Sequence, residues 1–260
     1  MTYTLISGAT GVLGGEFVRL LAQEGKNLFL TGRSEEKLKE LKDKLTAEFP
    51  AVNLQICACD LSSDVSRQNL FDCAGGFVFS GLINVAGADI QKPFEEYDEQ
   101  KLIFQTRACF EGAVSLTNFV LKHRAEKLQI INISSVSGLQ PMPYFALYSA
   151  SKCALTDFSV ALNAELKRKG VTVTAIIPGA IYTRPDVKEY IKTQGSWGRI
   201  AAKSPAFVAK KSLKAAKRKK AKYIVGSANR FLYALSKLVP QSIKLKMIAR
   251  RWSKTRKDAF

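Results

Sequence analysis

The chain of 260 residues lacks several features that define other classes of protein. It has no run of about 18 apolar residues, so we predict no membrane-spanning helix. The N-terminal sequence MTYTLISGATG has neither the basic region nor the long apolar stretch of a secretory signal, and we expect a cytoplasmic protein. The single histidine, His123, excludes sites that need several histidines. The five cysteines do not have the paired spacing of metal ligands. The sequence therefore predicts no metal site.

Acidic residues are scarce in one part of the chain only. Residues 203–260 contain 18 lysines and arginines but a single acid, Asp258, whereas residues 1–202 contain 22 basic and 21 acidic residues. The formal net charge of +18 therefore belongs almost wholly to the C-terminal part. With 47% apolar and 24% charged residues, the chain otherwise has the composition of a soluble globular protein, and its length favours one large domain.

Short apolar runs alternate with amphipathic, helix-like stretches. The runs typical of strands buried on both faces are 3–7, 27–31, 53–58, 81–84, 129–134, 172–177 and 223–226. The helix-like stretches between them are 12–24, 35–48, 63–73, 98–123 and 147–169. This alternation predicts an α/β fold of the Rossmann type, a doubly wound parallel sheet of about seven strands with helices on both faces. In such sheets ligands bind beyond the C-terminal ends of the strands.

A glycine-rich turn joins the first predicted strand to the first predicted helix. In Ser7-Gly8-Ala9-Thr10-Gly11-Val12-Leu13-Gly14, the three glycines permit a tight turn and a close approach of backbone N–H groups to a pyrophosphate. The following helix directs its positive end at the same place. This placement predicts a dinucleotide site.

The ends of the second and third strands carry one cation and one acid. Arg33 stands where an NAD site usually has an acid for the ribose 2′-hydroxyl, so we predict NADP(H) in preference to NAD(H). The alternative is that Arg33 is a solvated loop residue. Asp60 is placed to accept a hydrogen bond from an adenine amino group, or to cap the next helix, and the two roles are compatible.

Three residues with complementary chemistry follow in the second half of the chain. Tyr148 and Lys152 share one face of a predicted helix, and Ser135 follows the fifth strand at the ligand edge of the sheet. We expect the Lys152 ammonium and a nicotinamide ring to lower the pKa of Tyr148, whose phenol is a poor base at neutral pH. The Ser135 hydroxyl can donate to a substrate oxygen on which charge develops.

With these motifs in this order, residues 1–183 resemble the short-chain dehydrogenase/reductase (SDR) family, although the glycine spacing is nearer to the family's extended branch. Asn84-Val85-Ala86-Gly87 is similar to its Asn-Asn-Ala-Gly stretch, and Pro178–Thr183 to its Pro-Gly segment at the nicotinamide end. The resemblance implies Ser135, Tyr148 and Lys152 as catalytic residues and a homodimer or homotetramer packed through the fourth and fifth helices. The residues expected to contact the cofactor are Gly8, Thr10, Gly11, Val12, Leu13, Gly14, Arg33, Asp60, Leu61, Asn84, Ala86, Gly87, Tyr148, Lys152, Pro178, Gly179, Ile181 and Thr183.

One position departs from the family pattern. Where the family carries an asparagine that supports a proton relay to the lysine, Cys109 aligns here, or Gln105 if the helix register is shifted. A cysteine leaves the backbone carbonyl in place but loses the amide side chain, so we expect slower turnover or a rebuilt relay rather than an inactive protein.

The end of the chain divides into a predicted substrate lid and a basic extension. We assign residues 1–226 to the SDR domain, with the lid at about 184–203, and residues 227–260 to two amphipathic helices separated at Pro240. Basic residues interleaved with Leu, Ile and Trp in 227–257 suit peripheral binding to an anionic membrane. A helix packed on its own body, or a nucleic acid or another acidic partner, are the alternatives, nucleic acid being the less expected.

The sequence therefore predicts an NADP(H)-dependent oxidoreductase that interconverts a secondary alcohol and a ketone, with Tyr148 as acid and base. We expect a small, apolar or lipid-like carbonyl or alcohol as the substrate. The alternative is a regulatory or membrane-docking protein that binds a dinucleotide with little or no turnover.

Overall fold

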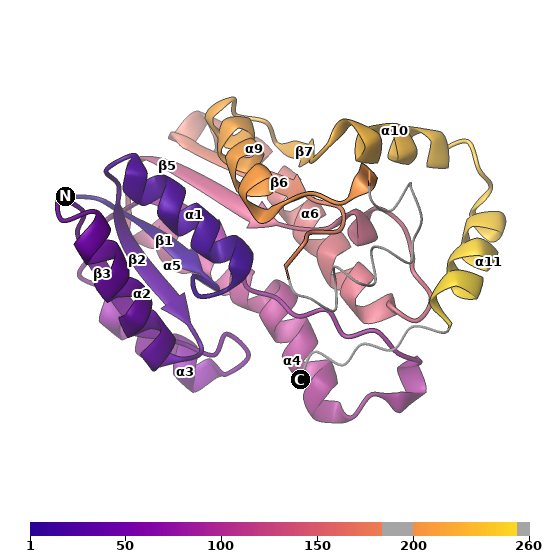
Figure 1. Cartoon of the computed structure of the whole chain (residues 1–260), viewed down its shortest axis with the longest axis horizontal. Helices are drawn as coiled ribbons and strands as arrows, with labels where there is room; N and C mark the ends of the chain where they lie inside the picture. Colours follow the sequence, from indigo (N-terminus) through magenta and orange to yellow (C-terminus); the bar gives the residue numbers. More distant parts are fainter. Residues whose placement is uncertain (184–199, 254–260) are drawn as a thin grey trace.

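The computed structural model describes residues 1–183 and 200–253, and its centre is a seven-stranded sheet (Figure 1). The strand order is β3-β2-β1-β4-β5-β6-β7, and every neighbouring pair is parallel, which confirms the predicted fold class. The strands are β1 Tyr3–Ser7, β2 Asn27–Gly32, β3 Leu54–Ala58, β4 Phe79–Asn84, β5 Arg124–Ile133, β6 Val171–Ile177 and β7 Lys222–Ile224. From β1 the chain adds strands on one side of the sheet, up to β3, and from β4 it adds them on the other side. The connections after β1 and β4 therefore diverge and leave a crevice at the C-terminal edge of the sheet.

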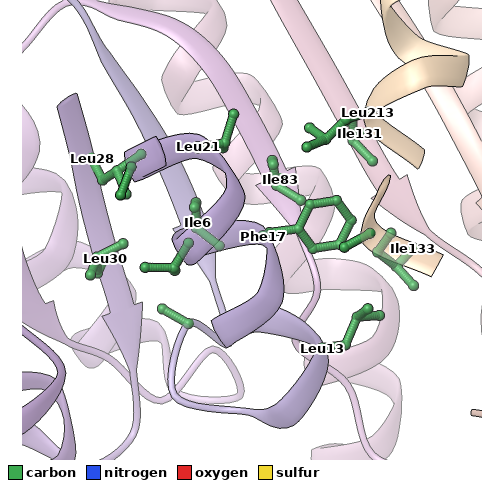
Figure 2. Packing of buried hydrophobic residues seen from close by; sticks show 14 of the residues in the cluster. Ile6, Leu13, Phe17, Leu21, Leu28, Leu30, Ile83, Ile131, Ile133 and Leu213 are labelled. Atoms are coloured by element: carbon green, nitrogen blue, oxygen red, sulfur yellow. The ribbon is translucent and has the colours of Figure 1, made fainter. Parts of the chain in front are cut away.

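Helices cover both faces of the sheet and give it two apolar cores. One core lies under α1 (Val12–Gln23), α2 (Glu35–Glu48) and α9 (Pro205–Lys217), and Figure 2 shows Phe17 of α1 packed among Ile6, Ile83 and Ile133 of the strands. The other lies under α3 (Asp64–Ala74), α5 (Gly112–Lys122) and α6 (Ala146–Leu166). Because successive strand residues point to opposite faces, the near-continuous apolar runs of the sequence serve both cores.

The stretch 98–123, predicted as one helix, is divided into three segments. It consists of α4 (Glu99–Thr106), a π-helical turn at Arg107–Glu111, and α5. Tertiary contacts hold the turn: Glu111 pairs with the buried Arg67 of α3, and a Cβ on Gly112 would lie 2.8 Å from Leu61 Cβ. Widened helical turns of this kind are frequent at functional sites.

The C-terminal extension forms the two predicted helices, α10 (Ser227–Ser236) and α11 (Gln241–Trp252), on either side of Pro240. Asn229 is the only buried residue of α10, and α11 has none. Figure 1 draws α11 beyond α10, outside the layers that enclose the sheet. Most of the predicted lid, 184–199, and the tail 254–260 lie outside the described residues. None of the helices described is long and apolar enough to span a membrane.

Candidate active site

The turn after β1 has the geometry of a phosphate-binding loop. Gly8 has a φ of +66°, and the Gly11 N–H donates to the Gly8 carbonyl at 3.0 Å. A Cβ on Gly14 would lie 2.0 Å from that same carbonyl oxygen, so the turn and the first turn of α1 approach each other as only glycine allows. The N-terminus of α1, without an acid in its first turn, faces the ligand edge of the sheet.

A pocket of about 310 Å³ opens beside this turn. Thr31 and Phe104 are among the residues that line the pocket, and the buried Thr31 Oγ1 makes no hydrogen bond. A glycine cradle, an unused buried hydroxyl and one apolar ring fit the phosphates and base of a dinucleotide. Ten of the residues predicted to contact the cofactor line the pocket, namely Gly8, Thr10, Gly11, Leu13, Gly14, Arg33, Asp60, Leu61, Ala86 and Gly87.

The other predicted cofactor residues lie outside this lining. Val12 is 50% exposed on the first turn of α1. Asn84 is buried, and its Nδ2 donates to Asn132 Oδ1 at 2.8 Å, which ties β4 to β5.

Arg33 and Asp60 both line the pocket, together with Phe104. The Arg33 guanidinium lies over the Phe104 ring, 5.5 Å from its centroid, so the residue is exposed yet held against the pocket wall. Asp60 Oδ1 accepts hydrogen bonds from the backbone N–H and hydroxyl of Ser62, at 2.9 and 2.7 Å. The suggestion that Asp60 caps the next helix is wrong, because Ser63 is the N-cap of α3 and accepts from Ser66 N–H.

Ser135 and the helix α6 that carries Tyr148 and Lys152 are packed together tightly. Ser135 begins a 3₁₀ turn, Val136–Leu139, directly after β5. A Cβ on Gly138 of this turn would lie 2.6 Å from the carbonyl carbon of Lys152, and Ser134 Oγ donates to the Lys152 carbonyl at 2.8 Å. The three residues predicted to be catalytic are thereby brought to one edge of the sheet.

Lys152 is almost fully buried and directed at the Tyr148 ring. Its Nζ donates to the Ile133 carbonyl at 2.9 Å and lies 5.7 Å from the centroid of the Tyr148 ring. Burial lowers the pKa of Lys152, whereas the nearby Cys109 and Asp89 act to raise it. Gly87 lies so close that a Cβ there would be 3.3 Å from Nζ, which brings the backbone after β4 to the lysine.

In the protein without a bound cofactor, burial dominates the pKa of Tyr148. Burial raises the pKa of Tyr148 above its ordinary value, with smaller contributions from Asp89 and Cys109. The Ser135 hydroxyl acts to lower the pKa of Tyr148 but does not outweigh burial. In the protein by itself Tyr148 therefore holds its proton at neutral pH. Asp89 was missed in the sequence because it lies in an irregular loop, five residues beyond β4.

Cys109 and Gln105 both point at the segment after β4. The Cys109 thiol donates to the Ala88 carbonyl at 3.1 Å and accepts from the Ala88 N–H, while Gln105 Nε2 donates to the same carbonyl at 3.3 Å. Cys109 lies in the π-helical turn, and a Cβ on Gly87 would be 3.5 Å from its Sγ and 3.3 Å from Lys152 Nζ, which supports its alignment with the family asparagine. Burial raises the pKa of Cys109, so the thiol is neutral.

The segment Pro178–Thr183 adjoins the catalytic turn. The Val136 N–H donates to the Pro178 carbonyl at 2.9 Å, and Ile181 forms a β-bridge with Lys203. Gly179 packs against Asn229 of α10, where a Cβ would lie 2.7 Å from Asn229 Nδ2. Asn229 was overlooked because the sequence assigns it to a separate extension. Among residues 1–183 and 200–253, no cluster of three or more His, Cys, Asp or Glu side chains could hold a metal ion.

Comparison with known proteins agrees with this geometry. The model of the short chain dehydrogenase family matches residues 2–193. The chain belongs to the short-chain dehydrogenase family. Members of this family are nicotinamide-dependent oxidoreductases that act on CH–OH and C=O groups.

Among its relatives are enzymes named very-long-chain 3-oxoacyl-CoA reductase. The one from Aspergillus terreus is 31% identical over 181 residues, which cover 67% of this chain and 51% of that protein. The one from Rattus norvegicus is 29% identical over 191 residues, which cover 70% and 60%. The chain thus matches about half to three-fifths of the length of these relatives.

Solved structures share the fold over nearly the whole chain. A 7β-hydroxysteroid dehydrogenase has a TM-score of 0.85 at 21% identity and covers 95% of this chain and 96% of its own. A variant of the actinorhodin polyketide ketoreductase with NADPH has a TM-score of 0.75 at 26% identity, with 88% and 97% covered.

Proposed function

We propose that the protein is an NADPH-dependent ketoreductase in which Tyr148 donates the proton to the substrate carbonyl. The observation that carries this proposal is the packing of Ser135, Tyr148 and Lys152 at the edge of the sheet, next to the glycine turn after β1. A purely dinucleotide-binding module would not require these three side chains together, and no feature of the site favours that alternative.

The chain's own residues divide the work of reduction. NADPH, when bound, supplies the hydride. Tyr148, whose pKa is raised by burial, keeps the proton on its Oη and gives it to the carbonyl oxygen as negative charge develops there. Ser135 donates a hydrogen bond to the same oxygen and so holds the carbonyl in place. The buried Lys152 ammonium stabilises the phenolate left behind, because it lies beside the Tyr148 ring.

The preference for NADP(H) over NAD(H) rests on Arg33. This cation lies at the end of β2, held by the Phe104 ring at the pocket mouth, where it can pair with a ribose 2′-phosphate. We expect Arg33→Ala to weaken NADPH binding by roughly tenfold or more and NADH binding little. Fluorescence titration with both nucleotides measures this, and an unchanged ratio of the two dissociation constants contradicts the assignment of Arg33.

The substrate that we propose is an apolar 3-oxoacyl thioester. Support comes from the relatives named 3-oxoacyl-CoA reductases and from the Phe145 ring, which stacks on Tyr148 at 4.5 Å and makes the surroundings of the phenol apolar. The test is NADPH oxidation with oxo compounds of graded chain length, for the wild type and for Tyr148→Phe. Turnover that rises with chain length and disappears in Tyr148→Phe supports the proposal, whereas turnover that survives the substitution refutes the role of Tyr148.

Residues 227–252, which comprise α10, α11 and the turn between them and which we call the C-terminal arm, are proposed to dock on an anionic membrane. Phe231, Leu238 and Met247 are 62%, 80% and 65% exposed, so the body of the protein does not cover this apolar face. The arm contains no acid, and its basic residues are Arg230, Lys237, Lys244, Lys246, Arg250 and Arg251. Apolar residues rimmed by cations fit a lipid surface better than a nucleic acid, which needs the charge alone.

Flotation with vesicles tests this docking. We expect binding to vesicles that contain phosphatidylserine, little binding to phosphatidylcholine alone, and loss of binding in Phe231→Asp/Leu238→Asp. Equal binding to both vesicle types, or none to either, contradicts the membrane proposal. The homodimer or homotetramer packed through the fourth and fifth helices stays a prediction. Sedimentation velocity measures the oligomeric state and so tests it.

A further inference from the structure

A stack of aromatic rings links the reactive tyrosine to the end of the C-terminal arm. The Tyr148 and Phe145 rings lie 4.5 Å apart at an interplanar angle of 23°, and the Phe145 and Trp252 rings lie 6.4 Å apart at 22°. Both separations are within the range of attractive ring pairs. The last turn of α11 therefore reaches the active site, although the sequence assigns it to an extension beyond every catalytic motif.

The segment before α6 is built to present Phe145 to this stack. Tyr144 has a φ of +61°, a left-handed conformation that bulky residues rarely adopt. The turn is closed by the Phe145 N–H, which donates to the Met142 carbonyl at 3.1 Å, and the Phe145 side chain is buried. This turn leads directly into Phe145, whose ring lies between those of Tyr148 and Trp252.

Two faces of α11 have different surroundings. Leu245, Ile248 and Trp252, spaced three and four residues apart, form one face and are all partly buried. Ile243 and Met247 lie on another face and are 49% and 65% exposed. The helix therefore keeps one apolar face partly covered, with Trp252 against Phe145, and leaves the other free for the lipid surface proposed above.

A cation lies at the far end of the ring stack. The Arg251 guanidinium is 5.8 Å from the centroid of the Trp252 ring, and Arg250 precedes it in the same turn. No acid occurs anywhere in Gln241–Trp252 that could neutralise these arginines within the helix. A substrate whose carbonyl lies at Tyr148 and whose chain follows Phe145 and Trp252 would bring its distal end to Arg251.

We propose that Trp252 and Arg251 form a distal subsite of the active site, in which Trp252 packs against the substrate chain and Arg251 binds a phosphate at its far end. The inference rests on the proposed function and narrows the substrate to a thioester of a phosphate-bearing carrier such as coenzyme A. Arginine suits this role because its planar fork pairs with phosphate oxygens and stacks on aromatic rings at the same time.

Steady-state kinetics with two thioesters of one acid test the subsite. The substrates are 3-oxooctanoyl-CoA and the N-acetylcysteamine thioester of 3-oxooctanoate, which carries no phosphate. We expect Arg251→Gln to raise KM for the CoA thioester about three- to tenfold, to leave its kcat within about twofold, and to leave KM for the other thioester unchanged. Trp252→Ala should raise KM for both substrates, and Trp252→Phe should restore it.

The matched control is Arg230→Gln on α10. The Arg230 guanidinium also lies 5.8 Å from the centroid of an aromatic ring, that of Tyr223, but away from the ring stack, so we expect no change for either thioester. An unchanged KM for the CoA thioester in Arg251→Gln, or an equal rise for both thioesters, overturns the subsite, and so does a Trp252→Ala variant with wild-type constants.

Failure of the proposed function has a different signature. If the wild type oxidises NADPH with neither thioester, the ketoreductase proposal fails, and calorimetric binding of octanoyl-CoA and its N-acetylcysteamine counterpart decides the subsite. A preference for the CoA thioester that Arg251→Gln removes and Arg230→Gln keeps supports the subsite, and the lack of such a preference overturns it.

Discussion

Phe17 of α1 and Phe231 of α10 are both phenylalanines, but their side chains have very different surroundings. Phe17 is fully buried between α1 and the sheet, whereas Phe231 is 62% exposed. The charges differ in the same way, since residues 1–202 are almost neutral and the arm is wholly basic. The body thus buries most of its large apolar residues, while the arm offers many of its own outward and touches the body through residues that include Asn229, Arg230 and Trp252. The residues of the body can therefore be explained by packing within the protein, whereas the exposed apolar and basic residues of the arm are explained only by a binding partner.

The largest effect that we expect separates the two phenylalanines. Phe17→Ala should lower the free energy of unfolding by about 3–5 kcal/mol, because it removes a buried ring and leaves a cavity. Phe231→Ala should change it by less than about 0.5 kcal/mol, since the ring is exposed. Urea unfolding measures both. A cost for Phe231→Ala as large as that for Phe17→Ala would break the comparison and would mean that α10 is packed in solution.

Two adjacent glycines of α1 sharpen the account of the body. Gly14→Ala should weaken NADPH binding by about a hundredfold or more, because the new Cβ would clash with the Gly8 carbonyl and displace the phosphate-binding turn. Gly15→Ala is the matched control, since its Cβ would meet only the Ala9 carbonyl oxygen at 3.9 Å. Titration with NADPH checks both, and equal losses in the two variants would contradict the role given to this turn.

Asp89→Asn probes the electrostatics of the site. Asp89 raises the pKa of Tyr148, so its neutralisation should lower that pKa. Because reduction needs the protonated phenol, activity that is lost as the pH rises should be lost at a lower pH in Asp89→Asn. Removing Asp89 also lowers the pKa of Lys152, which moves the profile in the same direction. The pH dependence of kcat measures this, with Asp72→Asn on the exposed side of α3 as control, and a shift to higher pH would contradict it.

The smallest effect concerns Cys109. Cys109→Asn should raise kcat by roughly two- to fivefold, because an amide at this place can support the proton relay to Lys152 that the family pattern implies. Cys73→Asn, at an exposed position, controls for the loss of a thiol. A fall in kcat at an unchanged melting temperature would mean that the thiol itself suits this site.

Much of the body could be predicted from local sequence patterns. Apolar runs bounded by turn residues indicated the strands of the sheet, and Ser7–Gly14 indicated where the pocket lies, because a glycine turn depends on local backbone geometry. The π-helical turn could not be found in this way, since it depends on the tertiary contacts of Glu111 with Arg67 and of Gly112 with Leu61.

The same limit applies to residues that act across the fold. Asp89 lies in an irregular loop without periodicity, and its effect on the pKa of Tyr148 arises only when β4 and α6 are adjacent. We predicted that Lys152 and a nicotinamide ring lower that pKa; in the protein alone burial dominates and raises it, and the lowering in the presence of the cofactor stays a prediction. Trp252 was assigned to the apolar face of an amphipathic helix, but its partner Phe145 precedes α6, and no local pattern connects the two.

Single-turnover reduction with NADPH that carries deuterium at C4 of the nicotinamide, on the face that transfers the hydride, tests the central claim most directly. With a 3-oxoacyl thioester the account predicts a 3-hydroxyacyl product with one deuterium on the carbinol carbon for the wild type, and at least about a thousandfold slower formation of it by Tyr148→Phe. Unlabelled alcohol, or labelled product formed at the wild-type rate by Tyr148→Phe, would contradict it.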